Sequence, residues 1–126
     1  MTNDDVLGTI GRYFEALGAD DGEAFAALFS EDVHFEDPVG GTVLTGRDGV
    51  MKFHRGVARA WESLDMQAED VFVRGSRAAV YWDAEGRSRS GKDIDFDGIN
   101  VLVLDDDGLI RRMEGYWDFE DVIAQM

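Results

Sequence analysis

The chain has 126 residues, no cysteine and a formal net charge of −15, from 27 acidic against 12 basic residues. This length predicts a single domain, residues 1–126, and the lack of cysteine excludes disulfides, thiolate metal sites and cysteine nucleophiles. The negative charge disfavours nucleic acids and anionic membranes as partners, and it leaves neutral, apolar small molecules as the ligands least discouraged.

Amphipathic helices are predicted for the first half of the chain. Thr2 or Asn3 can cap a first helix, whose apolar stripe has 3- and 4-residue spacing: Val6, Ile10, Tyr13 and Leu17. The sequence GADDG, residues 18–22, ends this helix. A short second helix is expected to bury Phe25, Leu28 and Phe29. After Gly46, a third helix is expected to bury Val50, Phe53, Val57, Trp61 and Leu64.

Strands are predicted where apolar residues alternate with polar ones. One short strand ends near residue 37, and from Met66 onward the alternation marks strands around 71–73, 78–84, 93–104 and 109–117. Helices followed by an antiparallel meander predict an α+β fold. We expect a cone in which three N-terminal helices pack on a curved, mostly antiparallel sheet and enclose an apolar cavity. The final FEDVIAQM can add one or two helical turns.

Three polar residues interrupt apolar faces. In HFEDPVGG, residues 34–41, side-chain alternation places Asp37 on the apolar face of its strand. Asn100 interrupts the apolar face of the strand at 93–104, and Tyr13 lies on the apolar stripe of the first helix. A buried polar group costs about 1–3 kcal/mol unless it is paired. Each of the three therefore either has a partner in the protein or lines a cavity where a ligand supplies one.

Each of these residues also has a purely structural explanation. Tyr13 can be a core residue with a satisfied hydroxyl, Asn100 can tie a strand to a loop, and Asp37 can cap its own turn. Taken together, however, they form a chemically coherent set. A carboxylate can accept a proton, while a phenol and an amide can donate to an oxygen that gains charge, which is the equipment for proton transfer next to a carbonyl group.

The chain resembles the ketosteroid isomerases over nearly its whole length. The resemblance lies in GRYFEAL, the helix–GADDG–helix unit, ALFSEDVHFEDPVGG, TGRDGVMKFH and the closing strand pair, and EDPVG is its most specific part. These isomerases belong to the nuclear transport factor 2-like superfamily, which also contains SnoaL-like polyketide cyclases and limonene epoxide hydrolases. The resemblance implies a cone-shaped fold with a deep apolar cavity, and it implies a homodimer.

The resemblance also implies roles for individual residues. Asp37 matches the general base, and Tyr13 matches the donor to the dienolate oxygen. Asn100 stands where the family has a protonated aspartate as second donor, and an amide donates a weaker hydrogen bond. The predicted wall of the ligand site comprises Phe53, Val57, Trp61 and Trp82, from periodicity, and Met113 and Trp117, from the resemblance.

The sequence therefore predicts an isomerase that acts on a neutral, apolar carbonyl compound, as steroid Δ-isomerases do, without a cofactor or a metal. The alternatives are a SnoaL-like polyketide cyclase, an epoxide hydrolase-like enzyme, for which no matching arginine can be placed, and a non-catalytic ligand-binding dimer. No apolar run approaches the roughly 20 residues of a membrane helix, and MTNDD lacks the features of a signal peptide. A cytoplasmic location is expected.

Overall fold

The computed structural model describes all 126 residues, and its elements confirm the predicted α+β class. Four helices and six strands follow one another along the chain: α1 (Asn3–Gly18), α2 (Gly22–Ala26), β1 (Phe29–Glu36), β2 (Val43–Thr45), α3 (Gly46–Ala60), β3 (Trp61–Arg74), β4 (Arg77–Ser88), β5 (Asp93–Leu104), β6 (Ile110–Tyr116) and α4 (Phe119–Gln125).

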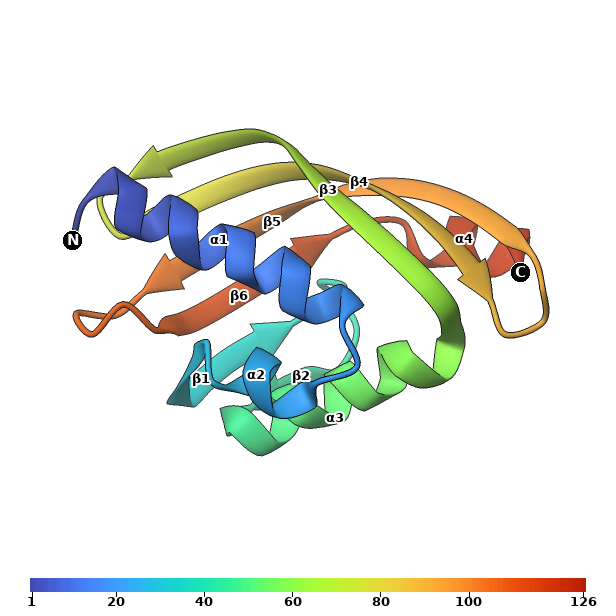
Figure 1. Ribbon diagram of the computed structural model, residues 1–126, viewed down its shortest axis with the longest axis horizontal. Coiled ribbons are helices and arrows are strands. Elements are labelled where there is room, and N and C mark those ends of the chain that lie inside the picture. The colour runs from blue at the N-terminus through green and yellow to red at the C-terminus, as the bar shows by residue number, and fades with distance from the viewer.

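All six strands form one curved sheet in the order β2-β1-β6-β5-β4-β3. Neighbouring strands are antiparallel except β1 and β6, which are parallel. The long strands arch over α1, while α2 and α3 lie below them next to β1 and β2 (Figure 1). The short helix α4 follows β6 and lies at one end of the sheet (Figure 1).

Helix α1 has well-defined ends that the sequence encodes. Thr2 and Asp5 form a capping box, in which the Asp5 backbone N–H donates to the Thr2 hydroxyl and the Thr2 N–H donates to the Asp5 carboxylate. At the other end, His54 Nε2 lies 2.9 Å from the carbonyl oxygen of Ala19 and 3.2 Å from that of Ala16. A buried histidine of α3 therefore contacts carbonyl groups at the end of α1 and ties the two helices together.

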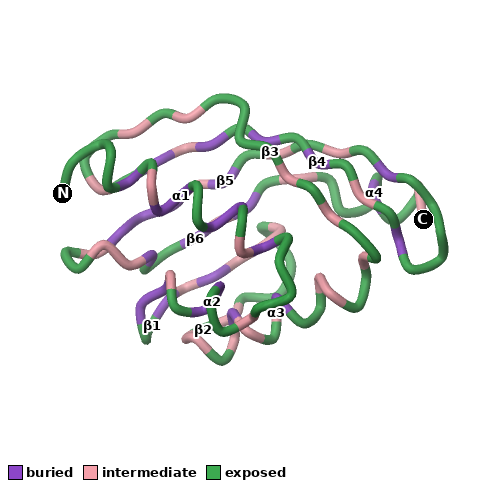
Figure 2. Tube along the Cα trace, in the orientation of Figure 1, coloured by how far each residue is buried: buried purple, intermediate pink, exposed green.

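The core lies between α1, α2 and the inner faces of β1, β4, β5 and β6, where the buried segments gather (Figure 2). Its centre is a group of aromatic rings in mutual contact: Tyr13, Phe14, Phe25, Phe29 and Phe35. Buried aromatic rings contribute large apolar areas to stability, and these rings hold β1 and α1 in fixed relation to each other.

Two boundaries and one strand differ from the predictions. Helix α3 ends at Ala60, so Trp61 and Leu64 belong to β3 rather than to the helix. Phe29 begins β1 instead of ending the second helix, and the edge strand β2 was not predicted. The closing segment forms the short helix that FEDVIAQM was expected to add, α4, whose first turn is capped by the Asp118 carboxylate. None of the four helices combines the length and apolarity that crossing a bilayer requires.

Candidate active site

Asp37 lies directly beyond the end of β1, where that strand runs parallel to β6. The pairing of Glu36 with Glu114 brings the Asp37 side chain over Gly115 of β6. A Cβ atom at position 115 would overlap the Asp37 carboxylate, so only glycine leaves this space open. The backbone N–H of Val39 donates to the Gly115 carbonyl at 2.8 Å, which fixes the turn that follows.

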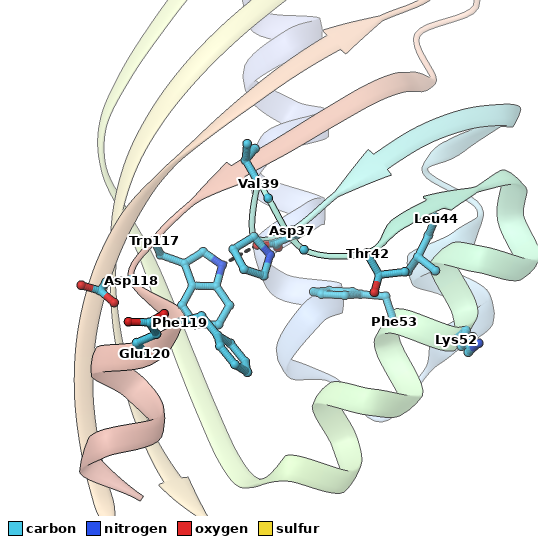
Figure 3. Close-up of a pocket in the computed structure, with 13 residues that line it drawn as sticks. Asp37, Val39, Thr42, Leu44, Lys52, Phe53, Trp117, Asp118, Phe119 and Glu120 are labelled. Atoms are coloured by element: carbon cyan, nitrogen blue, oxygen red, sulfur yellow. Dashed lines mark hydrogen bonds between the residues drawn. The ribbon is translucent and has the colours of Figure 1, made fainter.

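The two oxygens of the Asp37 carboxylate have different surroundings. The indole Nε1 of Trp117 donates a hydrogen bond to Oδ1 at 2.5 Å (Figure 3), whereas Oδ2 makes no hydrogen bond within the protein. Burial raises the pKa of Asp37 from 3.8 to about 6, and the Trp117 hydrogen bond acts in the opposite direction because it favours the charged form. Although the residue as a whole is only half-buried, desolvation of its carboxyl group dominates. One oxygen is thus held and the other is free to accept a proton.

Tyr13 and Asn100 meet behind this carboxylate. Both are almost completely buried, with exposed fractions of 0% for Tyr13 and 1% for Asn100. Asn100 Nδ2 donates to the Tyr13 hydroxyl oxygen at 3.5 Å, and Asn100 flanks the same Gly115 as Asp37. Burial and the negative charge of Asp37 raise the pKa of Tyr13 well above its usual range, so its phenol keeps its proton.

An apolar pocket of about 320 Å³ opens next to Asp37. This volume lies at the lower end of the range for small-molecule sites, roughly 300–1,000 Å³. The residues of its wall come from α1, α3, the inner sheet face and α4, and they include Phe53, Val57, Trp61, Trp82, Phe96, Trp117, Phe119, Val122 and Ile123. A second, more polar hollow of about 700 Å³ (Figure 3) shares five lining residues with it: Asp37, Pro38, Phe53, Trp117 and Phe119. Asp37 therefore stands at the junction of the two hollows.

The structure brings most of the predicted site residues together. Five of the six predicted wall residues, Phe53, Val57, Trp61, Trp82 and Trp117, line the apolar pocket. Met113 is fully buried in the core and lines neither hollow. Tyr13 and Asn100 also lie outside both linings, so Asp37 is the member of the polar set that is in direct contact with the pocket.

Sequence reasoning missed two glycines that shape the site. Gly115 makes room for the Asp37 carboxylate, and Gly98 of β5 makes room for the ring of Trp82, which a Cβ at that position would overlap. Both glycines interrupt the interior of a strand, which is the usual signal of a close approach by another group. That signal was present in the sequence, although the identity of the approaching group was not.

The arrangement provides one acid–base group at the edge of an apolar pocket, with neutral donors behind it. No group of three or more His, Asp or Glu side chains is placed to hold a metal ion. A carboxylate with a pKa of about 6 is mostly ionised at neutral pH and still basic enough to take a proton from an activated carbon. Fold and site together define the class: small α+β proteins whose curved sheet and helices surround a pocket with an acidic group.

Within that class, the chain belongs to the SnoaL-like domain family, whose sequence model matches residues 10–113. It is 30% identical over 123 residues to a steroid Δ-isomerase from Nocardioides simplex, a match that covers 95% of both chains. The predicted resemblance to steroid isomerases and SnoaL-like proteins is thereby confirmed.

Solved structures support the same fold. A Mycobacterium tuberculosis protein in complex with estradiol-17β-hemisuccinate has a TM-score of 0.82 at 23% identity, over 93% of this chain and 96% of that one. The epoxide hydrolase/cyclase-like enzyme SalBIII, which has a role in pyran ring formation in the polyether salinomycin, has a TM-score of 0.83 at 22% identity, over 94% of each chain. Both solved proteins thus share this architecture with the chain.

Proposed function

We propose that this protein is an enzyme that moves a proton next to the carbonyl group of a neutral, apolar ligand, in the manner of a steroid Δ-isomerase. One observation carries the proposal: the Asp37 carboxylate stands at the wall of an apolar pocket with Oδ1 held by Trp117 and Oδ2 unpaired. The similarity to a steroid Δ-isomerase at 30% identity supports it.

In the proposed reaction, Asp37 Oδ2 takes a proton from the carbon between the carbonyl group and an isolated C=C bond. The C–H electron pair forms a new double bond to the carbonyl carbon, and the carbonyl oxygen becomes negative. Tyr13 is fully buried and lines neither hollow, so this step requires the ligand oxygen to reach the Tyr13 hydroxyl behind the pocket wall, where the protonated phenol stabilises it by hydrogen bonding. Asp37 then returns the proton to the far carbon of the original C=C bond, the oxygen reverts to a carbonyl, and the carboxylate is regenerated. The double bond has moved into conjugation and no atom is lost.

The pocket favours a flat or ring-shaped apolar ligand. Trp61 and Phe96 lie parallel, with ring centroids 5.6 Å apart and an interplanar angle of 13°, and Phe96 also contacts Trp117. Such a surface offers stacking and dispersion contacts without polar partners. The ionised carboxylate of Asp37 and the net charge of −15 both disfavour an anionic ligand.

Aldol-type cyclisation of a polyketide-like ligand is a second candidate, and one observation favours it. Of the three polar residues only Asp37 lines the pocket, and a cyclisation that begins with proton abstraction needs only this base. An epoxide hydrolase of the limonene type would need an arginine beside its aspartates, and no arginine lines either hollow. The pocket therefore gives the hydrolase alternative little support.

The pH dependence of isomerisation tests the proposal. With 5-androstene-3,17-dione as substrate, kcat/KM should rise with pH, reach half its maximum near pH 6 and stay level above, because the base must be ionised and its pKa is about 6. Trp117→Phe should move this midpoint to higher pH, since the hydrogen bond that it removes favours the ionised carboxylate.

Trp61→Phe is the matched control for this experiment. Trp61 lines the same pocket, but it has no hydrogen bond to the carboxylate, so its replacement should leave the midpoint where it is. A rate that does not change between pH 4 and pH 8, or a midpoint that Trp117→Phe leaves unmoved, would rule out Asp37 as the base.

We also propose that two copies of the protein pack through the outer face of the sheet. Tyr81, Ile99 and Tyr116 are aligned across β4, β5 and β6, each at least 37% exposed, with Phe72 of β3 nearby. An exposed apolar row of this kind is typical of an interaction surface. Sedimentation equilibrium should give twice the mass of one chain, and Ile99→Asp, which places a charge in the row, should give a single chain. A monomeric parent protein would refute the proposal.

A further inference from the structure

Asn100 lies between two aromatic side chains, and each end of its carboxamide faces one of them. Trp82 Nε1 donates to Asn100 Oδ1 at 2.9 Å, and Asn100 Nδ2 donates to the Tyr13 hydroxyl oxygen at 3.5 Å. We propose, on the basis of the proposed function, that Trp82 is a positioning residue. It fixes the Asn100 amide with its N–H groups toward Tyr13, so that Asn100 acts on the ligand oxygen through Tyr13.

The indole of Trp82 determines which way the amide points. The oxygen and nitrogen ends of an asparagine side chain have nearly the same shape, so packing alone does not distinguish them, whereas an indole N–H can only donate. With the amide reversed, two donors would face each other in a buried site, and an unpaired buried donor is costly. The orientation with Oδ1 toward Trp82 is therefore strongly preferred.

Trp82 is itself held firmly enough to impose this choice. Its side chain is 1% exposed, and its ring rests on Gly98, where a Cβ would overlap it. Phe96 meets the same ring edge-to-face, with centroids 5.5 Å apart and an interplanar angle of 88°. The indole cannot swing away without displacing these neighbours, so the donor stays in place.

The fixed amide also directs the hydroxyl hydrogen of Tyr13. Because the Tyr13 oxygen accepts from Asn100, its own hydrogen points elsewhere, and no acceptor in the protein receives it. Trp82, Asn100 and Tyr13 thus form a chain in which each side chain donates to the next, and donors in such a chain strengthen one another. The chain ends at the Tyr13 hydroxyl hydrogen, which in the proposed reaction serves the ligand oxygen. The sequence predicted that Asn100 and Tyr13 would both donate directly to the ligand. The geometry instead puts Asn100 one step behind.

This arrangement also explains why an amide suits position 100 beside Trp82. The indole hydrogen bond to Oδ1 would favour the ionised form of a carboxylic acid at this position. An ionised acid could only accept, and it would then take the Tyr13 hydrogen instead of leaving it for the ligand. An amide cannot ionise, so it remains a donor toward Tyr13 at any pH.

A ligand that ionises provides the test. Equilenin, a steroid with a naphthol ring, fluoresces differently in its neutral and ionised forms, and the donors at an oxyanion site raise the ionised fraction of the bound molecule. At pH 7.5 we expect Trp82→Phe to lower the ratio of ionised to neutral bound equilenin by about 3- to 10-fold, the usual effect of losing one buried hydrogen bond. In an Asn100→Ala background, the same substitution should change the ratio by less than about twofold, because the two residues act as a unit.

Two controls separate this effect from general damage. Tyr81→Phe removes a side-chain donor from the neighbouring position of β4, but Tyr81 faces the opposite side of the sheet and donates to Asp97, so the ratio should stay within about twofold of the parent value. Asn100→Ala measured alone removes the acceptor without changing the Trp82 ring, and it should lower the ratio at least as much as Trp82→Phe. It therefore provides a second comparison if Trp82→Phe does not fold.

The outcomes are distinguishable. Equal ratios in the parent and in Trp82→Phe, or the same reduction with and without Asn100, would overturn this inference and leave the proposed function standing. Failure of the parent protein to ionise bound equilenin at all would overturn the proposed function, and this inference with it. A reduction that disappears in the Asn100→Ala background would establish Trp82 as the residue that orients the amide.

Discussion

Replacing Asp37 with Asn is expected to lower the rate of 5-androstene-3,17-dione isomerisation by about 10²–10⁴-fold, the usual contribution of a positioned general base. The amide fills the same space over Gly115 and can still accept the Trp117 hydrogen bond, but it cannot accept a proton from carbon. KM should change little, because the apolar wall that binds the ligand stays intact. The measurement is the increase in ultraviolet absorbance as the conjugated product forms.

Asp106→Asn is the matched control for this prediction. It makes the same change of charge and side chain in the turn between β5 and β6, where Asp106 is exposed, and it should leave the rate within about twofold of the parent value. Equal rates in the parent and in Asp37→Asn would remove the catalytic interpretation of the pocket and favour a protein that binds a ligand without transforming it.

The fold was largely predictable because its elements carry strong periodic signals. The stripe of Tyr13 and Leu17 predicted α1, and the alternation along β4 and β5 predicted their inner faces, which the structure buries. The junction at Ala60 and Trp61 was not predictable. Trp61 and Leu64 continue the helical spacing of α3 and also fit the inner side of β3, and no glycine or proline marks the change.

The residues of the candidate site were predictable to a similar degree, but the hydrogen bonds between them were not. Asp37 and Asn100 stood out because each is a polar residue on an apolar face, and the two do meet at Gly115. Trp82 and Trp117 were predicted only as apolar wall, yet each donates to one of these polar residues. Periodicity assigns a side chain to a face, but the partner of an indole N–H depends on register between strands, which a single sequence does not contain.

The same Asp37→Asn substitution is expected to stabilise the protein by about 2–3 kcal/mol at pH 8, measured by urea denaturation. A pKa raised from 3.8 to about 6 means that the folded state binds the proton more tightly than the unfolded state does. At 1.36 kcal/mol per unit, the ionised carboxylate then costs the folded protein about 3 kcal/mol. The lower expected value allows for the partial exposure of the residue.

The pH dependence of this gain identifies its origin. Below about pH 4 the carboxyl is protonated in the folded and the unfolded parent, so the two proteins should have similar stability there. Between pH 4 and pH 6 the carboxyl is ionised in the unfolded parent but still largely protonated in the folded parent, so rising pH favours unfolding and the parent becomes less stable relative to Asp37→Asn. Above about pH 7 both states are ionised and the difference should stay constant. Asp106→Asn should show no such difference, since that carboxylate is exposed in the folded state. A gain already present at pH 4, or a loss at pH 8, would contradict the assignment.

Catalytic loss combined with a stability gain confined to higher pH is the behaviour of a group kept for its chemistry, because a purely structural aspartate would lower the free energy of unfolding when removed.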